Sequence, residues 1–429
     1  MIGLQLPQLS AADPDLFGEG GIDALGLASL AGSLADLIAP TVTDRMQNAQ
    51  TRFLTVMACC AQINEELEDV PPIDGRSLPY LVSEWFVVEA LCRERQAPFD
   101  RVPGIRKARA ALGRGGHLDA ASYLVMPSVF GYHGIFNPLA RHLGILDAGL
   151  RLAASGFELA EAWEAESGFP GFITGKSGTT GARLATYLAE AIGRGLRRGR
   201  ADYPEGAQLW GQLRRAFDPR AAGPRERDLL WNWLTRPADP VQRELLVAID
   251  GFSDLAGNDR DLMSRLQPTA SEELGLRFDA IDTFERVARL LTRSFESLRY
   301  LSTARGSTPL APTDLADMGA ISLAATSLPR ACEEATRALA KFDLDNAFVA
   351  ELGDFAQSLT ATDYVVAVLA RHDRVQYGRG KRPWFDAVGT GYVVRSLHRL
   401  DVLDTTEDRF VHPFRLEPLR SFVRDLRRG

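Results

Sequence analysis

Apolar residues recur every three or four positions between residues 273 and 301, which is the pitch of an amphipathic α-helix. Thr269 followed by Glu272 matches a capping box at the start of this helix. On the opposite face, Glu285 and Arg289 have the i,i+4 spacing of a solvated ion pair. A helix of this length must bury its apolar stripe against other elements, so the segment predicts a mostly α fold.

Other parts of the chain repeat this spacing, whereas alternating patterns typical of strands are short and few. Helical segments are expected at 46–67, 79–95, 179–197, 239–250, 313–341 and 343–372. Ser327 before Pro329 suits the cap and first residue of a helix that continues through Leu339. The predicted class is a multi-domain, mostly α protein.

The chain of 429 residues is longer than one ordinary hydrophobic core, because domains usually hold about 100–200 residues. Stretches rich in glycine, proline and arginine at 197–206 and 218–227, and a break at 306–312, suggest boundaries. The expected domains are 1–170, an N-terminal helical domain ending in a winged-helix-like unit; 171–225, a connector and helix; 226–308, a central helical domain with the long helix; and 309–429, a C-terminal helical domain with a basic winged-helix-like unit.

The winged-helix interpretation depends on the similarity between two segments of the chain, residues 141–147 and residues 398–404. Both segments resemble the end of an amphipathic helix that turns into a short apolar strand. The elements expected after them are a strand at 150–152 and a helix at 155–163 in the first case, and a hairpin turn at 405–408, a strand at 410–411 and a helix at 417–426 in the second. Helix, strand, turn and strand is the local plan of a winged helix, so one or two such units are expected.

Charge is unevenly distributed along the chain, whose net charge is −7. Residues 371–429 contain thirteen arginines and lysines against eight acids, whereas residues 1–100 contain five arginines against fifteen acids. A basic end beside a winged unit is typical of a nucleic-acid contact, and Trp384 nearby suggests base stacking. The residues predicted to bind nucleic acid are Arg374, Arg379, Lys381, Arg382, Arg399, Arg415 and Arg420. A second basic group comprises Arg194, Arg197, Arg198, Arg200, Arg214 and Arg215.

The glycine-rich segment at 171–181 resembles a nucleotide-binding loop but fails on spacing. A phosphate-binding loop of the Gly-x4-Gly-Lys-Ser/Thr type requires glycine at position 170, where the chain has Pro170. The segment is therefore expected to be a connector. Its amides, together with Lys176, Ser177 and Thr179, remain a weaker candidate for binding an anion at the start of the next helix.

No familiar catalytic motif occurs in the sequence, and no cofactor or metal is expected. The enzyme alternative is a metal-dependent nuclease or hydrolase that uses His133, His142 and scattered carboxylates. The pair His372 and Asp373 lacks the further ligands of a metal-dependent phosphohydrolase. His372 is interpreted instead as a residue at a helix C-terminus.

A third alternative is a scaffold that binds partner proteins through the acidic first hundred residues and through Trp231 and Trp233. The residues at 1–5 lack the basic and apolar runs of a secretory signal, and no run of about 20 apolar residues could span a bilayer. The four cysteines include no CxxC pair. A cytoplasmic location without membrane contact is therefore expected.

Three stretches carry a resemblance to known proteins. They are Gly26-Leu27 with residues 37–43 and Arg52-Phe53-Leu54; Gly131-Tyr132 with residues 143–147, Gly156 and Leu159-Ala160; and residues 412–416 with Leu419-Arg420. In these stretches the chain resembles uncharacterised helical proteins of bacterial anti-phage defence islands. The resemblance implies a subunit that works beside nucleases or ATPases, and it implies no catalytic residues. The leading hypothesis is thus a non-enzymatic subunit that binds nucleic acid or partner proteins.

Overall fold

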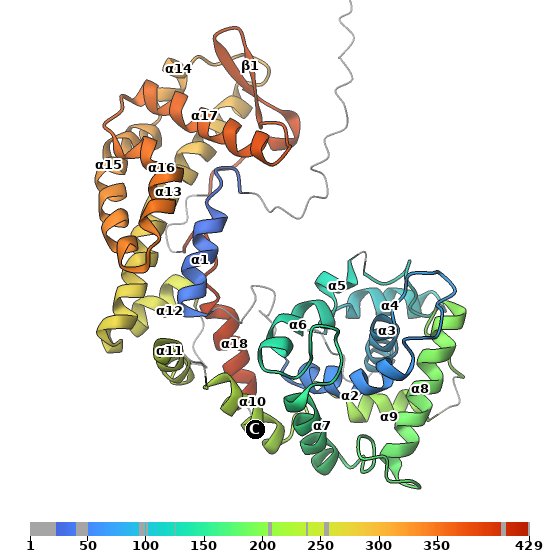
Figure 1. Ribbon diagram of the computed structural model, residues 1–429. Helices are drawn as coiled ribbons and strands as arrows, with labels where there is room; N and C mark the ends of the chain where they lie inside the picture. Colours follow the sequence, from blue (N-terminus) through green and yellow to red (C-terminus); the bar gives the residue numbers. More distant parts are fainter. Residues whose placement is uncertain are drawn as a thin grey trace, which may run out of the picture. The chain divides into compact units, whose positions relative to one another are not determined.

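The computed structural model describes residues 23–39, 50–93, 99, 102–124, 126–204, 208–236, 239–252, 257–404 and 409–427. These residues are mostly helical, as the apolar spacing predicts (Figure 1). Within them, the one sheet is a two-stranded antiparallel hairpin. No helix in these ranges combines the length and the apolar character needed to cross a bilayer.

The chain divides into two compact units, each built from two separate segments. Unit 1 comprises Met1–Ile38 and Asn258–Phe414, and unit 2 comprises Ala39–Gly257 and Arg415–Gly429. The glycine- and proline-rich breaks predict a different division, into four domains that succeed one another along the chain. The two divisions differ because the helix at 28–38 packs with residues 258–414 and the helix at 416–427 packs with residues 39–257, and breaks along the chain do not reveal such distant packing.

Unit 1 is organised around α13, the long helix that the sequence predicts. Its elements are α1 (Ala28–Ile38), α12 (Asp259–Leu266), α13 (Glu272–Ala304), α14 (Pro312–Ala316), α15 (Gly319–Leu339), α16 (Asp345–Leu352), α17 (Ala361–Gly378), β1 (Phe385–Val388) and β2 (Gly391–Val394), with short 3-10 turns at 267–269, 340–342, 353–356 and 396–398. α15 packs along α13, and α1 and α17 also contact it. The predicted apolar stripe of α13 is buried from Leu274 to Leu298.

Three details of unit 1 differ from the sequence predictions. Ser271, not Thr269, caps α13 by accepting a hydrogen bond from the Leu274 amide at 3.3 Å. Pro329 lies inside α15 and does not begin it. The helix continues because the apolar face on both sides of the proline is buried, and this burial offsets the hydrogen bond that proline removes. Glu285 is fully buried and is not part of a solvated pair with Arg289.

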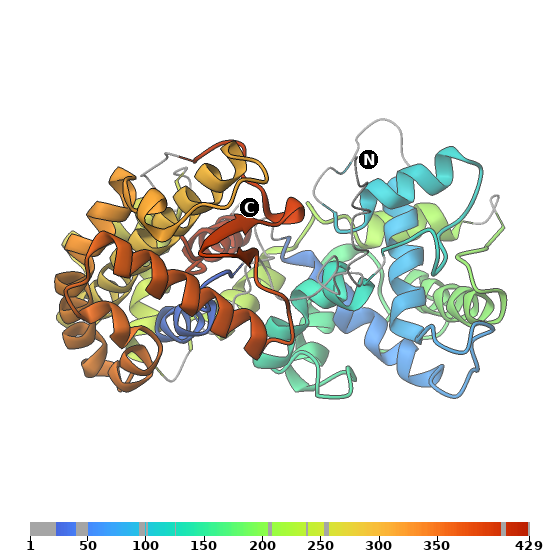
Figure 2. The same cartoon turned by 90° about the horizontal axis from the view of Figure 1, so that it is seen from above.

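The hairpin follows α17, and Figure 2 shows it from above. Phe385 pairs with Val394 and Val388 pairs with Gly391, and Leu310 bridges to Tyr392 on the outer edge of β2. The strands predicted after His398 and at 410–411 are wrong, because residues 399–404 and 410–411 form bends and irregular backbone. The hairpin turn predicted at 405–408 lies outside the described residues.

Unit 2 contains the other helices. They are α2 (Arg52–Glu66), α3 (Pro79–Cys92), α4 (Ile105–Gly113), α5 (Pro127–Phe130), α6 (Tyr132–His142), α7 (Ala154–Ser167), α8 (Thr180–Arg198), α9 (Leu209–Ala216), α10 (Pro224–Leu234), α11 (Pro240–Asp250) and α18 (Leu416–Arg427). α3 lies at the centre and contacts α2, α4, α6, α8 and α9. α18, predicted at 417–426, packs on α10 and α11. An antiparallel bridge joins Leu146 to Leu152 between α6 and α7, where the sequence predicts a turn and strand.

Candidate functional site

Three arginines gather around one carboxylate where α8 ends in unit 2. Arg194 and Arg200 place Nη2 at 3.9 and 3.6 Å from Oδ2 of Asp202, and Arg198 donates a hydrogen bond to the same oxygen. We call Arg194, Arg198, Arg200 and Asp202 the arginine cluster. The hydrogen bond from Arg198 lowers the pKa of Asp202, burial opposes this, and the charges of the three arginines lower it further. With three guanidinium groups for one carboxylate, the cluster has two positive charges in excess.

The local backbone explains why these residues meet. Gly199 adopts a left-handed conformation (φ +69°) and ends α8, with its amide donating to the Gly195 carbonyl at 2.7 Å. A side chain is disfavoured at this φ, so glycine suits the turn. The chain then reverses and the Ala201 amide donates to the Leu118 carbonyl at 2.8 Å. This turn brings Arg200 back toward the last arginines of α8.

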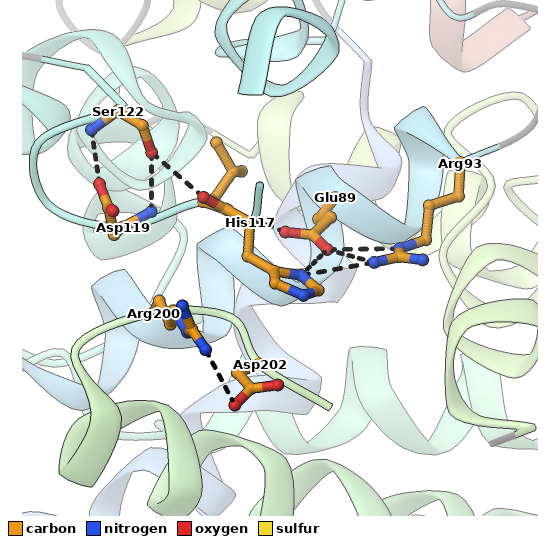
Figure 3. A network of polar contacts seen from close by, with 8 residues as sticks. Glu89, Arg93, His117, Asp119, Ser122, Arg200 and Asp202 are labelled. Carbon is orange, nitrogen blue, oxygen red and sulfur yellow. Dashed lines mark hydrogen bonds and ion pairs between the residues drawn. The ribbon is translucent and has the colours of Figure 1, made fainter. Parts of the chain in front are cut away.

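A buried network supports the loop that pairs with Arg200 (Figure 3). The carboxylate of Glu89 is fully buried and accepts hydrogen bonds from Arg93 Nη2 (2.7 Å), His117 Nδ1 (2.8 Å) and the Leu118 amide (2.9 Å). The Arg93 guanidinium also lies 4.1 Å from the ring centroid of Trp210. A buried charge with this many partners holds its neighbours in one arrangement, so the loop that pairs with the Arg200 backbone is firmly held.

The next turn of the same loop is also fixed by hydrogen bonds, as Figure 3 shows. The Asp119 carboxylate accepts from the amides of Ala121 and Ser122 at 2.9 and 2.6 Å, and the Ser122 hydroxyl accepts from the Asp119 amide at 3.0 Å. Asp119 forms a backbone bridge with Arg200. The position of Arg200 is therefore determined on both sides of the bridge.

Two half-buried tyrosines lie beside the cluster. Burial raises the pKa of Tyr203, the neighbouring Glu190 and Tyr187 raise it further, and Arg194 lowers it. Tyr187, Glu190 and Arg194 share one face of α8, because they are spaced three and four residues apart. Aromatic rings beside a group of arginines can stack on nucleic-acid bases while the arginines contact phosphates.

The structure divides the predicted C-terminal nucleic-acid set between the units. In unit 1, three arginines each have one carboxylate: Arg374 with Asp354 at 3.3 Å, Arg379 with Asp23 at 2.6 Å, and Arg382 with Asp386 at 3.4 Å. Lys381 is half-buried and Arg399 is exposed. In unit 2, Arg415 donates to the Ala39 carbonyl at 3.0 Å and Arg420 is 6% exposed. A guanidinium as buried as that of Arg420 is poorly placed to reach a phosphate.

Trp384 is not available for base stacking, contrary to the sequence prediction. Its side chain is 6% exposed, the His398 ring stacks on it at 4.7 Å, and the Arg299 guanidinium lies 4.8 Å from its ring centroid. Trp231 and Trp233 are half-buried in unit 2, and the Arg427 guanidinium lies 4.3 Å from the Trp231 ring.

The glycine-rich loop already binds an anion of the chain itself. The carboxylate of Glu164 accepts hydrogen bonds from the amides of Gly171 (2.7 Å), Ile173 (2.7 Å) and Thr174 (3.1 Å) and from the Thr174 hydroxyl (2.7 Å). Burial would raise the pKa of Glu164, but these hydrogen bonds lower it overall. Thr179 caps α8 by accepting from the Ala182 amide. Lys176 and Ser177 are exposed, and anion binding by them stays a prediction.

The histidines of the enzyme alternative do not meet. His133 is buried and donates from Nδ1 to Glu84 at 2.9 Å, whereas His142 is exposed at the end of α6. Among the described residues, no three histidine, cysteine, aspartate or glutamate side chains gather as a group that could hold a metal ion. His372 is buried within α17, not at its C-terminus, and bridges two backbone groups.

Sequence reasoning missed the buried glutamates, which organise both units. Glu84 accepts from the Tyr123 hydroxyl at 2.6 Å and from the amides of residues 132 and 133 in unit 2. Glu285 accepts from the amides of residues 411 and 412 in unit 1. The signal was present for the first of them, since Glu84 and Glu89 interrupt an otherwise apolar run at 81–92. A charge in such a run is buried and therefore needs partners.

The fold and this site together define a helical protein of two compact units with an arginine cluster in one of them. Comparison with family models, with curated proteins and with solved structures finds no match for the chain.

Proposed function

We propose that this protein is a non-enzymatic subunit that binds nucleic acid, and that the arginine cluster of unit 2 contacts the phosphate backbone. The observation that carries the proposal is the charge imbalance at Asp202, where three guanidinium groups face one carboxylate. Guanidinium groups form bidentate hydrogen bonds with phosphate oxygens, and an uncompensated pair of charges attracts such an anion. The network around Glu89 holds the loop with which the Arg200 backbone pairs, so this backbone is in place before a ligand arrives.

The net charge of the whole chain makes a local site necessary. At −7 the protein repels a polyanion at long range, so attraction must come from a concentrated basic surface at short range. Tyr187 and Tyr203 beside the cluster would add stacking with bases, which favours a single strand whose bases are open.

The basic residues of unit 1 are proposed as a second contact. Arg374, Lys381, Arg382 and Arg399 flank the hairpin that follows α17. A helix followed by a hairpin is the arrangement of a winged helix, and we propose winged-helix-like units here and around the 146–152 bridge. The proposed setting is a cytoplasmic assembly of the anti-phage type, with partner subunits that carry the chemistry.

The test is a fluorescence-anisotropy titration with labelled single-stranded and duplex DNA over a salt series. The double variant Arg198→Ala/Arg200→Ala should weaken binding and reduce the slope of log Kd against log salt by about one to two units, since each phosphate contact contributes about one. The matched control is Arg330→Ala/Arg337→Ala, which removes the same charge from arginines that each pair with one glutamate on α15.

The proposal is refuted if the protein binds neither single-stranded nor duplex DNA at low salt. It is also refuted if the control variant loses as much affinity for DNA as Arg198→Ala/Arg200→Ala. The alternative of a scaffold that binds partner proteins is favoured by exposed apolar side chains in unit 1, where Val388, Leu397 and Val402 are 48%, 61% and 75% exposed. It predicts instead that substitution of these three residues by serine abolishes co-purification with the products of adjacent genes, with DNA binding unchanged.

A further inference from the structure

Unit 1 contains a cavity of about 420 Å³ that the nucleic-acid proposal does not use. The start of α1, one face of α13, Trp384 and the 411–412 segment line it. Its walls are largely the buried apolar side chains of Leu25, Leu27 and Phe295. This size and this lining are typical of sites for small organic ligands, which range over roughly 300–1,000 Å³.

Two unlike polar groups face this cavity from α13. Glu296 and Arg299 lie one turn apart, on the same face of the helix as Thr292 and Phe295. Within the described residues, Glu296 makes no hydrogen bond or ion pair, and it does not pair with Arg299. Arg299 donates from Nε to the His398 carbonyl at 2.9 Å, which leaves its Nη groups for another acceptor. A donor and an acceptor that face one cavity without pairing with each other can both form hydrogen bonds with a ligand there.

A histidine with a fixed orientation completes the polar lining. His412 donates from Nδ1 to Glu285 at 2.6 Å, and Glu285 also accepts the backbone amides of residues 411 and 412. These contacts hold the ring and leave Nε2 without a partner among the described residues. Asp23, by contrast, is fully engaged, because it accepts from the amides of Leu27 and Ala28 and pairs with Arg379. Asp23 therefore positions α1 and is not expected to bind the ligand.

We propose that this cavity binds a guanine base, with Arg299 donating to the acceptor edge at O6 and N7 and Glu296 accepting from the N–H donors of the same ring. Arginine recognises O6 and N7 of guanine in this way in nucleic-acid complexes. Residues three apart on a helix have Cβ atoms about 5–6 Å apart, and this separation suits a planar ring that offers an acceptor edge and a donor edge side by side. The apolar walls then bury the ring faces.

The electrostatics of the site favour a neutral ligand over a zwitterion. Burial raises the pKa of Glu296, although the charge of Arg299 opposes this. Burial lowers the pKa of Arg299, so at both residues it disfavours the charged form. A site that penalises ionised groups would have to strip water from both charges of a zwitterion such as an amino acid. A neutral heterocycle meets the same donor and acceptor at a smaller desolvation cost.

Guanine could come from a free nucleoside or from a base in a single strand, and two titrations of the whole chain distinguish these sources. The first uses calorimetry with guanosine and with adenosine. The second uses anisotropy with an oligo-dT strand and with the same strand carrying one central dG. Because the second readout is a difference between two strands, it separates the cavity from any phosphate contact in unit 2, and failure of either proposal can be recognised.

The diagnostic variant is Glu296→Leu, with Glu333→Leu as the control, since Glu333 is 70% exposed on α15 and pairs with Arg337. Guanosine, or the dG-containing strand, should bind the wild type about tenfold or more tightly than adenosine or oligo-dT, and Glu296→Leu should abolish this preference while the control keeps it. If Glu296→Leu fails to fold by circular dichroism, Glu296→Ala replaces it, since alanine also lacks the acceptor. The inference is overturned if the wild type shows no guanine preference in either titration, or if the preference survives the substitution.

Discussion

At the scale of single residues, His372 shows how burial can determine the protonation state of a side chain. It is fully buried in unit 1, donates from Nδ1 to the Ala24 carbonyl at 2.8 Å and accepts from the Trp384 amide at Nε2, also at 2.8 Å. A ring that donates at one nitrogen and accepts at the other must be neutral. Burial lowers the pKa of His372 to about 4; the Ala24 hydrogen bond opposes this, and the charges of His398 and Arg299 add to the lowering.

This low pKa predicts a loss of stability in mild acid. The unfolded state takes up a proton near pH 6.5 whereas the folded state does so only near pH 4, so the contribution of His372 is complete above pH 6.5 and is lost as the pH falls toward 4. The loss should be on the order of 3 kcal/mol, from about 1.4 kcal/mol per pKa unit. Urea unfolding at pH 7, 5.5 and 4.5, with a probe in unit 1, measures it.

The control for this prediction is His372→Gln, because glutamine can donate to Ala24 and accept from Trp384 but cannot ionise. The variant should be somewhat less stable than the wild type at neutral pH. Its unfolding free energy should nevertheless decline less steeply between pH 6.5 and 4. Parallel declines in the two proteins would show that other groups cause the acid sensitivity.

At the scale of secondary-structure elements, the start of α8 explains one glycine of the loop at 171–181. A Cβ on Gly181 would lie 2.1 Å from the Phe169 carbonyl oxygen and 2.5 Å from that of Pro170. Both are backbone atoms, which cannot move aside as a flexible side chain can. Gly181 is thus required by close packing of the helix on the preceding turn, and no phosphate ligand is needed to account for it.

Substitution of Gly181 by alanine should therefore destabilise unit 2 by about 2 kcal/mol or more, because overpacking typically costs 1–3 kcal/mol. The matched control is Gly211→Ala on α9, where a Cβ meets no atom within 4 Å. That change should stabilise the helix by about 0.5–1 kcal/mol, since alanine is the better helix former. Thermal unfolding of both variants measures the difference, and equal melting temperatures would contradict the packing argument.

At the scale of the whole molecule, each unit depends on a segment from the far end of the chain. In unit 1, α1 buries its apolar face and contacts α13, some 240 residues later. Arg277 donates to the Leu37 carbonyl, and Arg371 donates from Nε to the Leu25 carbonyl at 3.0 Å. In unit 2, α18 returns to pack on α10 and α11. Neither unit is complete without its second segment.

A fragment of residues 257–414 should accordingly fold poorly and expose the surface that α1 covers. We expect it to bind the dye ANS, and a synthetic peptide of residues 23–39 should bind the fragment and reduce the ANS signal. A peptide with Leu34→Glu is the control, because Leu34 is fully buried in unit 1. Cooperative unfolding of the fragment alone, at the melting temperature of unit 1 in the intact chain, would refute this dependence.

The sequence alone determined the helical class and the positions of its clearest helices. The apolar stripe at 273–301 and the helix at 417–426 were predictable because amphipathic spacing is a local property that depends only on residues a few helical turns apart. The second basic group, with Arg194, Arg198 and Arg200, was also visible as a run of like charge. The sequence did not show that these arginines gather around the carboxylate of Asp202.

Only the tertiary structure decided which charges are in excess and which are neutralised. Arg379 looks as available as Arg198 in the sequence, but Arg379 has Asp23, more than 350 residues away, as its own partner, whereas Arg198 shares Asp202 with two other arginines. Glu285 looks like a surface residue in the sequence, but in the structure it accepts hydrogen bonds from the amides of residues 411 and 412. The free energy of a charge depends on its burial and on its partners in space, and the partners that matter here come from segments that spacing along the chain does not connect.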